Sequence, residues 1–239
     1  MRTRVLITAA GMGKRFGALT RRTNKCLLTV AGQPLLRGIL ANFHSAHCGP
    51  IYLVTGYQAR QVESSVKALV KPIYNPFFAV SGILGSFWAA RNALAGHPFI
   101  FTTSDHFFSK PLIRACLRKT HGMRIIVQKK KIYTKEDAKV IIRGSRVVQM
   151  GKHLPPHHAD GEFGGMTYFS GKASALFFKE LRLHFENEGL EGYMMDLLMK
   201  IHHKYKLPVL YSLCAEDSRI EIDSVHDLIA ARRMAARLK

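Results

Sequence analysis

The chain has 239 residues, 47% of them hydrophobic, which suits one large core and falls in the usual single-domain range. Its net charge of +20 is spread along the chain, which favours a solvated basic surface over a dedicated nucleic-acid site. The four cysteines form no C-x-x-C pair, and no apolar stretch reaches the ~18 residues of a membrane-spanning helix, so we expect a soluble, cytoplasmic protein.

In the first part of the chain, apolar strand patterns alternate with helical patterns. Strands are predicted at residues 5–10, 50–56, 72–74 and 98–105, and helices at residues 34–46, 59–70 and 86–95. This alternation predicts an α/β fold with a mainly parallel sheet between two layers of helices. Ligands of such sheets bind at the carboxyl ends of strands, where the loop after residue 10 and Asp105 lie.

From residue 123 onward the predicted strands are shorter and hairpin-like. They cover residues 123–131, 139–152 with a turn at Gly144, and 163–171. Helices at 173–188 and 193–205, a strand at 207–213, a strand-like segment at 219–223 and a helix with Ser224 as its N-cap complete the chain.

The loop after the first strand reads AAGMGKR at residues 9–15. Its two glycines allow a tight turn whose N–H groups can face phosphate oxygens, although an ordinary strand-to-helix turn can use glycines too. A dinucleotide loop would need glycine where Phe16 stands, and a P-loop would need a hydroxyl at Arg15. The remaining pattern, with Arg15 and Lys25 behind the loop, supplies the cations that a reacting triphosphate requires.

These motifs resemble the signature of the sugar-phosphate and alcohol-phosphate nucleotidyltransferases. The similarity continues through TNK at 23–25, VTGY at 54–57, Asp105, GG at 164–165 and EID at 221–223. The segment SDH at 104–106 and the hairpin at 136–152 are similar to inositol-1-phosphate cytidylyltransferases, whereas other motifs are similar to phosphocholine cytidylyltransferases. The chain departs from the pattern at Cys26, where many relatives have proline, and at Met194-Met195, where phosphocholine enzymes tend to place tryptophan against a quaternary ammonium.

The resemblance implies a Rossmann-like three-layer α/β/α fold that transfers a cytidylyl group from CTP to an alcohol phosphate. We expect one domain over residues 1–239, with a nucleotide-binding half at 1–110 and an acceptor-binding half at 111–239. Catalysis is expected from Arg15, Lys25 and Asp105, with Mg²⁺ held by Asp105 and Asp223. The nucleotide-binding set is expected to comprise Ala9, Ala10, Gly11, Met12, Gly13, Arg15, Lys25, Gly56, Gly85 and Ser86.

For the acceptor side we predict contacts from Lys139, Gly165 and Asp196, with solvated surface charges as the alternative for the two charged residues. His106 is expected to support Asp105 without binding the metal itself. The other histidines lack metal-ligand spacing, so a mobile loop near residues 153–158 is the better interpretation.

Two alternative functions stay open at the level of sequence. One is uridylyl or guanylyl transfer to a sugar 1-phosphate. The other is a non-catalytic basic module on the same fold that binds RNA or a lipid surface. As partners we expect CTP and a phosphorylated small-molecule acceptor, such as inositol phosphate, phosphocholine, 2-aminoethylphosphonate or glycerol phosphate. A weak attraction to anionic membrane or nucleic acid, and a homodimer, are further expectations.

Overall fold

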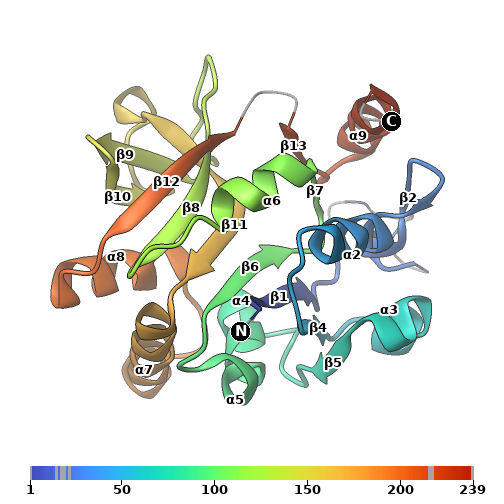
Figure 1. The fold of residues 1–239 in the computed structure, drawn as a ribbon, viewed down its shortest axis with the longest axis horizontal. Coiled ribbons are helices and arrows are strands. Elements are labelled where there is room, and N and C mark those ends of the chain that lie inside the picture. The colour runs from blue at the N-terminus through green and yellow to red at the C-terminus, as the bar shows by residue number, and fades with distance from the viewer. Residues whose placement is uncertain (1, 14–15, 17–19, 21–22, 215–217, 238–239) are drawn as a thin grey trace.

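A computed structural model describes residues 2–13, 16, 20, 23–214 and 218–237. Nine strands form one mixed sheet in the order β5-β4-β1-β6-β11-β8-β12-β10-β9 (Figure 1). Two further pairs, β2 with β3 and β7 with β13, lie outside it. The strands are β1 Arg4–Ala9, β2 Thr29–Val30, β3 Gln33–Pro34, β4 Ile51–Thr55, β5 Lys71–Tyr74, β6 Phe99–Thr103, β7 His106–Phe108, β8 Met123–Gln128, β9 Lys139–Arg143, β10 Arg146–Gly151, β11 Gly161–Phe169, β12 Val209–Cys214 and β13 Arg219–Glu221.

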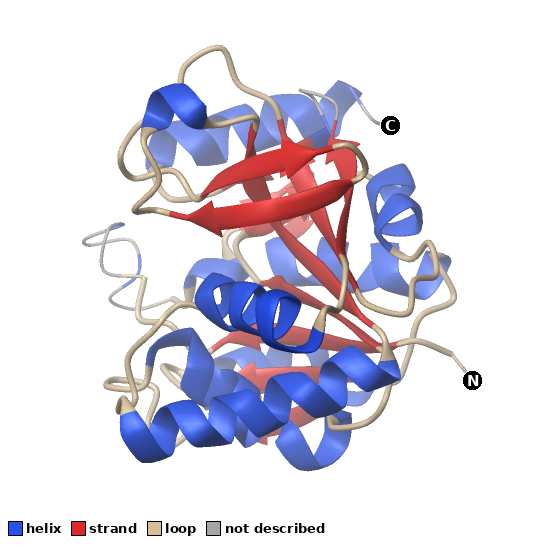
Figure 2. Cartoon of the chain, turned by 90° about the vertical axis from the view of Figure 1, so that its left-hand side faces the viewer, coloured by secondary structure: helices blue, strands red, loops and turns tan. Residues whose placement is uncertain are grey.

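Helices cover both faces of the sheet (Figure 2). The cluster on one face contains residues of α2, α3, α6 and α9, and the cluster on the other contains residues of α4, α5, α7 and α8. The helices are α2 Leu35–Ser45, α3 Ala59–Val66, α4 Gly82–Ala89, α5 Arg91–Leu94, α6 Lys110–Cys116, α7 Gly171–Asn187, α8 Met194–Tyr205 and α9 Val225–Arg237, with 3-10 turns η2 Lys25–Leu27, η3 Lys67–Leu69 and η4 Pro156–His158. No helix in these described ranges is long and apolar enough to cross a membrane.

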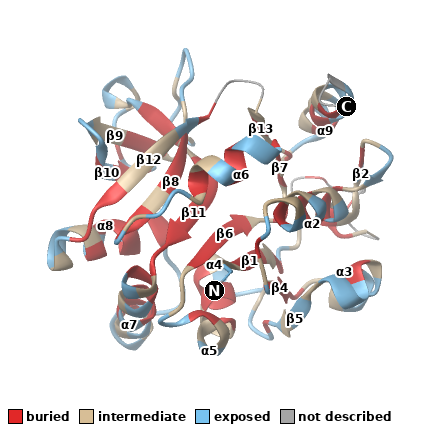
Figure 3. Ribbon diagram, in the orientation of Figure 1, coloured by how far each residue is buried: buried red, intermediate tan, exposed pale blue. Residues whose placement is uncertain are grey.

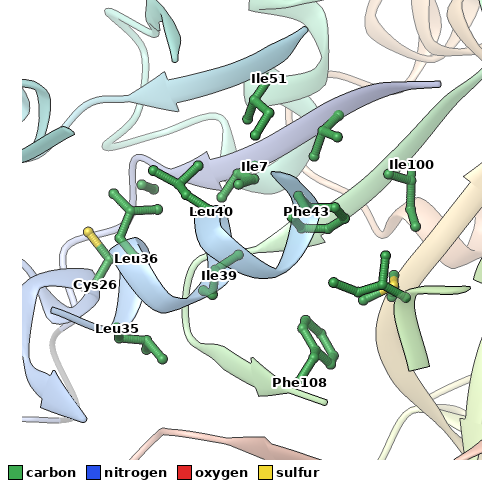
Figure 4. Packing of buried hydrophobic residues seen from close by; sticks show 14 of the residues in the cluster. Ile7, Cys26, Leu35, Leu36, Ile39, Leu40, Phe43, Ile51, Ile100 and Phe108 are labelled. Atoms are coloured by element: carbon green, nitrogen blue, oxygen red, sulfur yellow. The ribbon is translucent and has the colours of Figure 1, made fainter. Parts of the chain in front are cut away.

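Strand β1 shows why the sheet is buried on both faces. Val5 and Ile7 belong to the cluster under α2, whereas Leu6 belongs to the opposite cluster, and all three are fully buried. Figure 4 shows Leu40 of α2 lying against Ile7, and Figure 3 shows the central strands buried. A strand covered on both faces needs continuous apolar sequence, which is the pattern read from residues 5–10. The layers and the Rossmann-like α/β fold are therefore as predicted.

The second half of the sheet has a different topology. β11 runs antiparallel to both β6 and β8, whereas β12 runs parallel to β8. The predicted hairpin is present as β9 and β10, with Gly144 at a φ of 56° in its turn. Because β9 also pairs with β11, the strands β11, β8, β12, β10 and β9 form a closed cycle of pairings.

Some elements differ from the prediction. The helix predicted at 86–95 starts earlier and is divided into α4 and α5. β7 and α6 were not predicted at all. The three residues of β7 are too few to show a period, and the strand exists because it pairs with the distant β13.

Candidate functional site

A cavity of about 390 Å³ lies at the carboxyl ends of β1 and β6. The Gly-rich loop forms one side, α4 contributes Ser86, and the segment after β6 contributes Asp105. This is the edge at which parallel α/β sheets bind ligands. The lining residues are Thr8, Ala9, Ala10, Gly11, Gly13, Phe16, Asn24, Lys25, Phe78, Gly82, Ile83, Ser86, Thr103, Ser104, Asp105 and Asp223.

The ammonium group of Lys25 lies between the carboxylates of Asp105 and Asp223. Its Nζ is 3.0 Å from Oδ2 of Asp105 and 2.6 Å from Oδ1 of Asp223. The Lys25 side chain is only 12% exposed, and its Nζ is also 5.6 Å from the ring centroid of Phe16. Residues about 80 and 200 positions apart in sequence thus form one charge cluster in the cavity.

The side chain of Asn24 fixes the backbone on either side of Lys25 by hydrogen bonds. This side chain caps η2 by accepting a hydrogen bond from the Cys26 N–H at 3.2 Å, and it donates to the carbonyl of Tyr57 at 3.0 Å. The same amide group lies 3.5 Å from the carbonyl of Ala9, where the Gly-rich loop begins. Asn24 is buried and so ties three parts of the cavity wall together.

Asp105 is held as a carboxylate by its neighbours. Its Oδ1 accepts hydrogen bonds from Thr103 Oγ1 at 2.5 Å and from His106 Nδ1 at 3.0 Å. Burial by itself raises the pKa of Asp105, but the hydrogen bond and positive potential of the His106 ring, the positive charge of Lys25 and the hydrogen bond from Thr103 outweigh it and hold that pKa well below its usual range. The carboxylate therefore stays charged and can bind a cation.

A backbone contact brings the second carboxylate to the first. The N–H of Ile222 donates to the carbonyl of Asp105 at 2.9 Å, which continues the antiparallel pairing of β13 with β7. Asp223 follows at once and is placed beside Lys25. Beyond it, Ser224 Oγ accepts from the Asp227 N–H at 3.2 Å, so Ser224 caps α9 as predicted.

Three carboxylates could share one metal ion. One oxygen from each of Asp105, Glu221 and Asp223 lies within 4.8 Å of the others. Hard divalent cations such as Mg²⁺ prefer oxygen ligands, so this donor set fits such an ion. Lys25 Nζ occupies the position of a cation between two of the three.

The predicted nucleotide-binding residues fall into three groups. Ala9, Ala10, Gly11, Gly13, Lys25 and Ser86 line the cavity, whereas Met12, Gly56 and Gly85 do not belong to its lining. Gly56 and Gly85 are tightly packed instead: a Cβ at Gly56 would lie 2.5 Å from Phe78, and one at Gly85 would lie 1.9 Å from Ser81 Oγ. Arg15, the third group, lies outside the described residues.

The predicted acceptor residues lie apart from the cavity lining. Lys139 is fully buried, and its Nζ donates to the carbonyls of Thr134, Lys135 and Asp137 at 3.1, 3.0 and 2.9 Å. All three of its N–H donors are used, so Lys139 has none left for a phosphate in this conformation. The geometry gives Lys139 a role in holding its own loop.

Gly165 and Asp196 have different surroundings. Gly165 has a φ of 76° and packs on His106, with only 2.3 Å between a Cβ built there and His106 Nε2. Asp196 lies in the first turn of α8 and is exposed. Its pKa is raised by partial desolvation, which the positive potential of His153 and His184 opposes.

Sequence reasoning missed several residues of the site. Glu221 was seen only as part of a motif, and Thr103 and Arg219 were not considered. Thr103 and Glu221 stand at strand ends next to the predicted carboxylates, a position that could have indicated them. Arg219 has no such signal, because its contacts come from distant strands.

The chain is similar to known proteins over nearly its whole length. A 2-aminoethylphosphonate cytidylyltransferase of Lancefieldella rimae is 25% identical over 240 residues, which cover 96% of this chain and 92% of the relative. Among solved structures, the inositol-1-phosphate CTP transferase from T. maritima gives a TM-score of 0.80 at 17% identity, covering 100% of this chain and 96% of that one. A putative glucose-1-phosphate thymidylyltransferase from Bacillus anthracis gives 0.81 at 18% identity, covering 98% and 95%.

These two structural likenesses establish the nucleotidyltransferase fold. The model of the MobA-like NTP transferase domain matches residues 5–182, most of the chain and nearly every element around the cavity. The Gly-rich loop, Lys25 and Asp105 all fall inside the matched range, while Asp223 reaches the cavity from beyond it. The chain therefore belongs to the family of the MobA-like NTP transferase domain.

Proposed function

We propose that the chain transfers a cytidylyl group from CTP to the phosphate or phosphonate of a small alcohol-type acceptor, releasing pyrophosphate. The observation that carries the proposal is the Lys25 ammonium held between Asp105 and Asp223 beside the Gly-rich loop. Such a cluster suits a reaction in which one anion attacks another, because cations must screen the two. The choice of CTP is supported by the similarity of the chain to the L. rimae cytidylyltransferase and to the T. maritima CTP transferase.

The chemistry assigns a task to each part of the cavity. An acceptor oxygen attacks the α-phosphorus, and the bond from that phosphorus to the bridging oxygen of pyrophosphate breaks. Lys25 neutralises the reacting phosphates, and the N–H groups of residues 9–13 face the nucleotide. Ser86 lines the same cavity and is proposed to contact the base. Arg15 is proposed, from the family resemblance, to bind the outer phosphates.

Mg²⁺ is the proposed metal, and Asp105 and Asp223 are its proposed ligands, with Glu221 within reach. When bound, the ion would lower the charge of the triphosphate and so favour departure of pyrophosphate. Lys25 has to leave at least one carboxylate for the metal to bind there. Its flexible side chain can then turn toward the phosphates.

We further propose that the chain works as one domain with a nucleotide-binding half at residues 1–110 and an acceptor-binding half at 111–239. Both halves contribute strands to the same sheet, which supports the proposal. Gly165 and Asp196 remain the proposed acceptor-side residues. An exposed aspartate suits an acceptor with hydroxyl or amine groups, since both can donate hydrogen bonds to it.

Uridylyl, thymidylyl or guanylyl transfer to a sugar 1-phosphate is the second candidate, favoured by the likeness to the B. anthracis structure. Melting temperatures measured with CTP, UTP, dTTP, GTP and ATP plus Mg²⁺ separate the two, because a ligand that binds only the native state raises the melting temperature. We expect the largest rise with CTP.

Pyrophosphate release is then assayed with CTP and phosphocholine, 2-aminoethylphosphonate or inositol 1-phosphate. A larger shift with another nucleotide, or no release with any acceptor, would contradict the proposal.

A further inference from the structure

His106 lies behind Asp105 with both ring nitrogens in contact with polar atoms. The residue is 4% exposed, and its ring stacks on Phe108 at 5.3 Å between centroids and 9° between planes. Nδ1 is 3.0 Å from Asp105 Oδ1 and 2.7 Å from Thr103 Oγ1. The stacking and burial restrict rotation of the ring, so each nitrogen keeps its neighbours.

The other nitrogen faces an arginine. Arg219 Nη2 lies 3.0 Å from His106 Nε2, and Arg219 is 6% exposed. A guanidinium has donors only, so Nε2 must accept this hydrogen bond. Glu221 also lies near Nε2, but its Oε2 is 3.6 Å away, beyond hydrogen-bond distance, and is itself 3.0 Å from Arg219 Nη2.

Two further side chains contact the guanidinium in this orientation, Gln128 and Glu162. Nη1 donates to Gln128 Oε1, and Nη1 is also 3.8 Å from Glu162 Oε2. Glu162 pairs in turn with Lys130 at 2.6 Å. Arg219 of β13 is therefore held by residues of β8 and β11 in the orientation in which it contacts His106.

We infer that Arg219 and His106 are positioning residues for Asp105: Arg219 holds the imidazole in the Nδ1–H form, and Nδ1–H fixes the orientation of the carboxylate. With the proton on Nδ1, His106 and Thr103 both point donors toward Oδ1 of Asp105. Oδ2 is then the oxygen that faces Lys25. A neutral ring with the opposite tautomer would place a lone pair against the carboxylate and repel it.

Gly165 is part of the same arrangement. Its φ of 76° and the 2.3 Å from a Cβ built there to His106 Nε2 mean that a side chain at this position would displace the ring. Gly165 therefore serves Asp105 through His106, by leaving room for the contact between Nε2 and Arg219.

The tautomer can be observed in the free protein, without nucleotide or metal. Two-bond ¹H–¹⁵N correlation spectra of protein labelled with ¹⁵N-histidine distinguish the two neutral tautomers and the doubly protonated ring. The protein has 12 histidines, and the signal of His106 is identified as the one missing in His106→Asn. At one fixed pH near neutrality we expect the Nδ1–H pattern. An Nε2–H or doubly protonated pattern in the wild-type protein overturns the inference.

The role of Arg219 is tested with Arg219→Met, which removes the donor and keeps an apolar side chain. We expect loss of the pure Nδ1–H pattern, whereas Arg143→Met, which changes an arginine with a 74% exposed side chain, leaves it intact. If Arg219→Met does not fold by circular dichroism, Gly165→Ala replaces it and should change the pattern in the same way. An unchanged pattern in folded Arg219→Met shows that Arg219 does not select the tautomer, and an unchanged pattern in folded Gly165→Ala shows that the contact between Nε2 and Arg219 does not.

A second test measures enzyme activity and therefore rests on the proposed function. His106→Leu should lower kcat for cytidylyl transfer by about 10–100-fold with little change in KM for CTP, because groups that orient metal ligands typically contribute this much. His106→Asn places an amide donor near the position of Nδ1 and should recover most of the loss, whereas His106→Gln should not. Equal losses in His106→Asn and His106→Leu contradict a role for the donor. If the wild-type protein transfers no cytidylyl group, the proposed function fails, but the spectra still decide the tautomer.

Discussion

Two lysines, Lys25 and Lys139, were both predicted to bind phosphate, and the structure gives them opposite surroundings: the Lys25 side chain is 12% exposed and Lys139 is fully buried. Lys25 Nζ faces two carboxylates inside the cavity. Lys139 Nζ faces three backbone carbonyls of its own loop. Carboxylates can exchange the lysine for a metal ion when an anionic ligand arrives. Backbone carbonyls of a tight loop have no such alternative. The partners of such a lysine therefore distinguish a cation that a ligand can reach from one that only holds the loop together.

Loss of Lys25 should have the largest effect on turnover. In the proposed reaction Lys25 screens the reacting phosphates. Lys25→Gln removes this charge, and we expect kcat to fall by about 10²–10³-fold, the usual cost of one stabilising donor in a transition state. Pyrophosphate release with CTP and the best acceptor measures the effect. The matched control is Lys135→Gln, an exposed lysine, which should keep wild-type kcat. Near-wild-type kcat in Lys25→Gln would refute its assignment.

Loss of Lys139 should act on stability instead. Lys139→Met leaves three loop carbonyls without their donor, and we expect a loss of about 3 kcal/mol in the free energy of unfolding. Urea unfolding followed by circular dichroism measures it, with Lys135→Met as the control. The folded fraction of Lys139→Met should keep its kcat. A fall in kcat with unchanged stability would instead favour the predicted phosphate contact.

Loss of the Lys25 charge should also change the affinity of the site for a metal ion, by a smaller factor than it changes kcat. In the free protein Lys25 neutralises the site, so removing its charge should strengthen Mn²⁺ binding in the absence of nucleotide by about tenfold, or about 1.4 kcal/mol. Electron paramagnetic resonance titration of free Mn²⁺ compares Lys25→Gln with the wild type. Adding Asp223→Asn to Lys25→Gln should abolish the gain, because a carboxylate ligand is lost. Weaker Mn²⁺ binding in Lys25→Gln would show that Lys25 does not compete with the ion.

The fold was largely predictable because its signals are local. The continuous apolar runs of β1 and β6, and the hairpin around Gly144, are properties of neighbouring residues. β7 was not predicted because only its pairing with β13 makes it a strand. Tertiary contacts of this kind leave no period in the sequence.

The cavity lining was predictable where a residue type has few alternative uses at its position. Lys25 and Asp105 follow a loop and a strand end at the ligand-binding edge, and the resemblance added Asp223. For Lys139 the sequence showed a charge beside a hairpin, but only the structure shows that the side chain turns back onto carbonyls. Arg219 reaches His106 from a strand more than 100 residues away, so its role depends on packing alone.

Cys26 offers the last test, because it follows Lys25 but points into the core. Burial raises the pKa of its thiol from 9.0 to about 12. A raised pKa means that its contribution to stability is fully present below the unfolded value and is lost as pH rises toward the folded one. From about pH 8 to about pH 9.5 the wild type should therefore lose ~0.8 kcal/mol relative to Cys26→Ala. Urea midpoints across this range measure the difference. The cavity left by Cys26→Ala lowers stability equally at every pH, so it does not affect the slope, and parallel pH profiles would mean that the thiol ionises as readily in the folded protein as in the unfolded one.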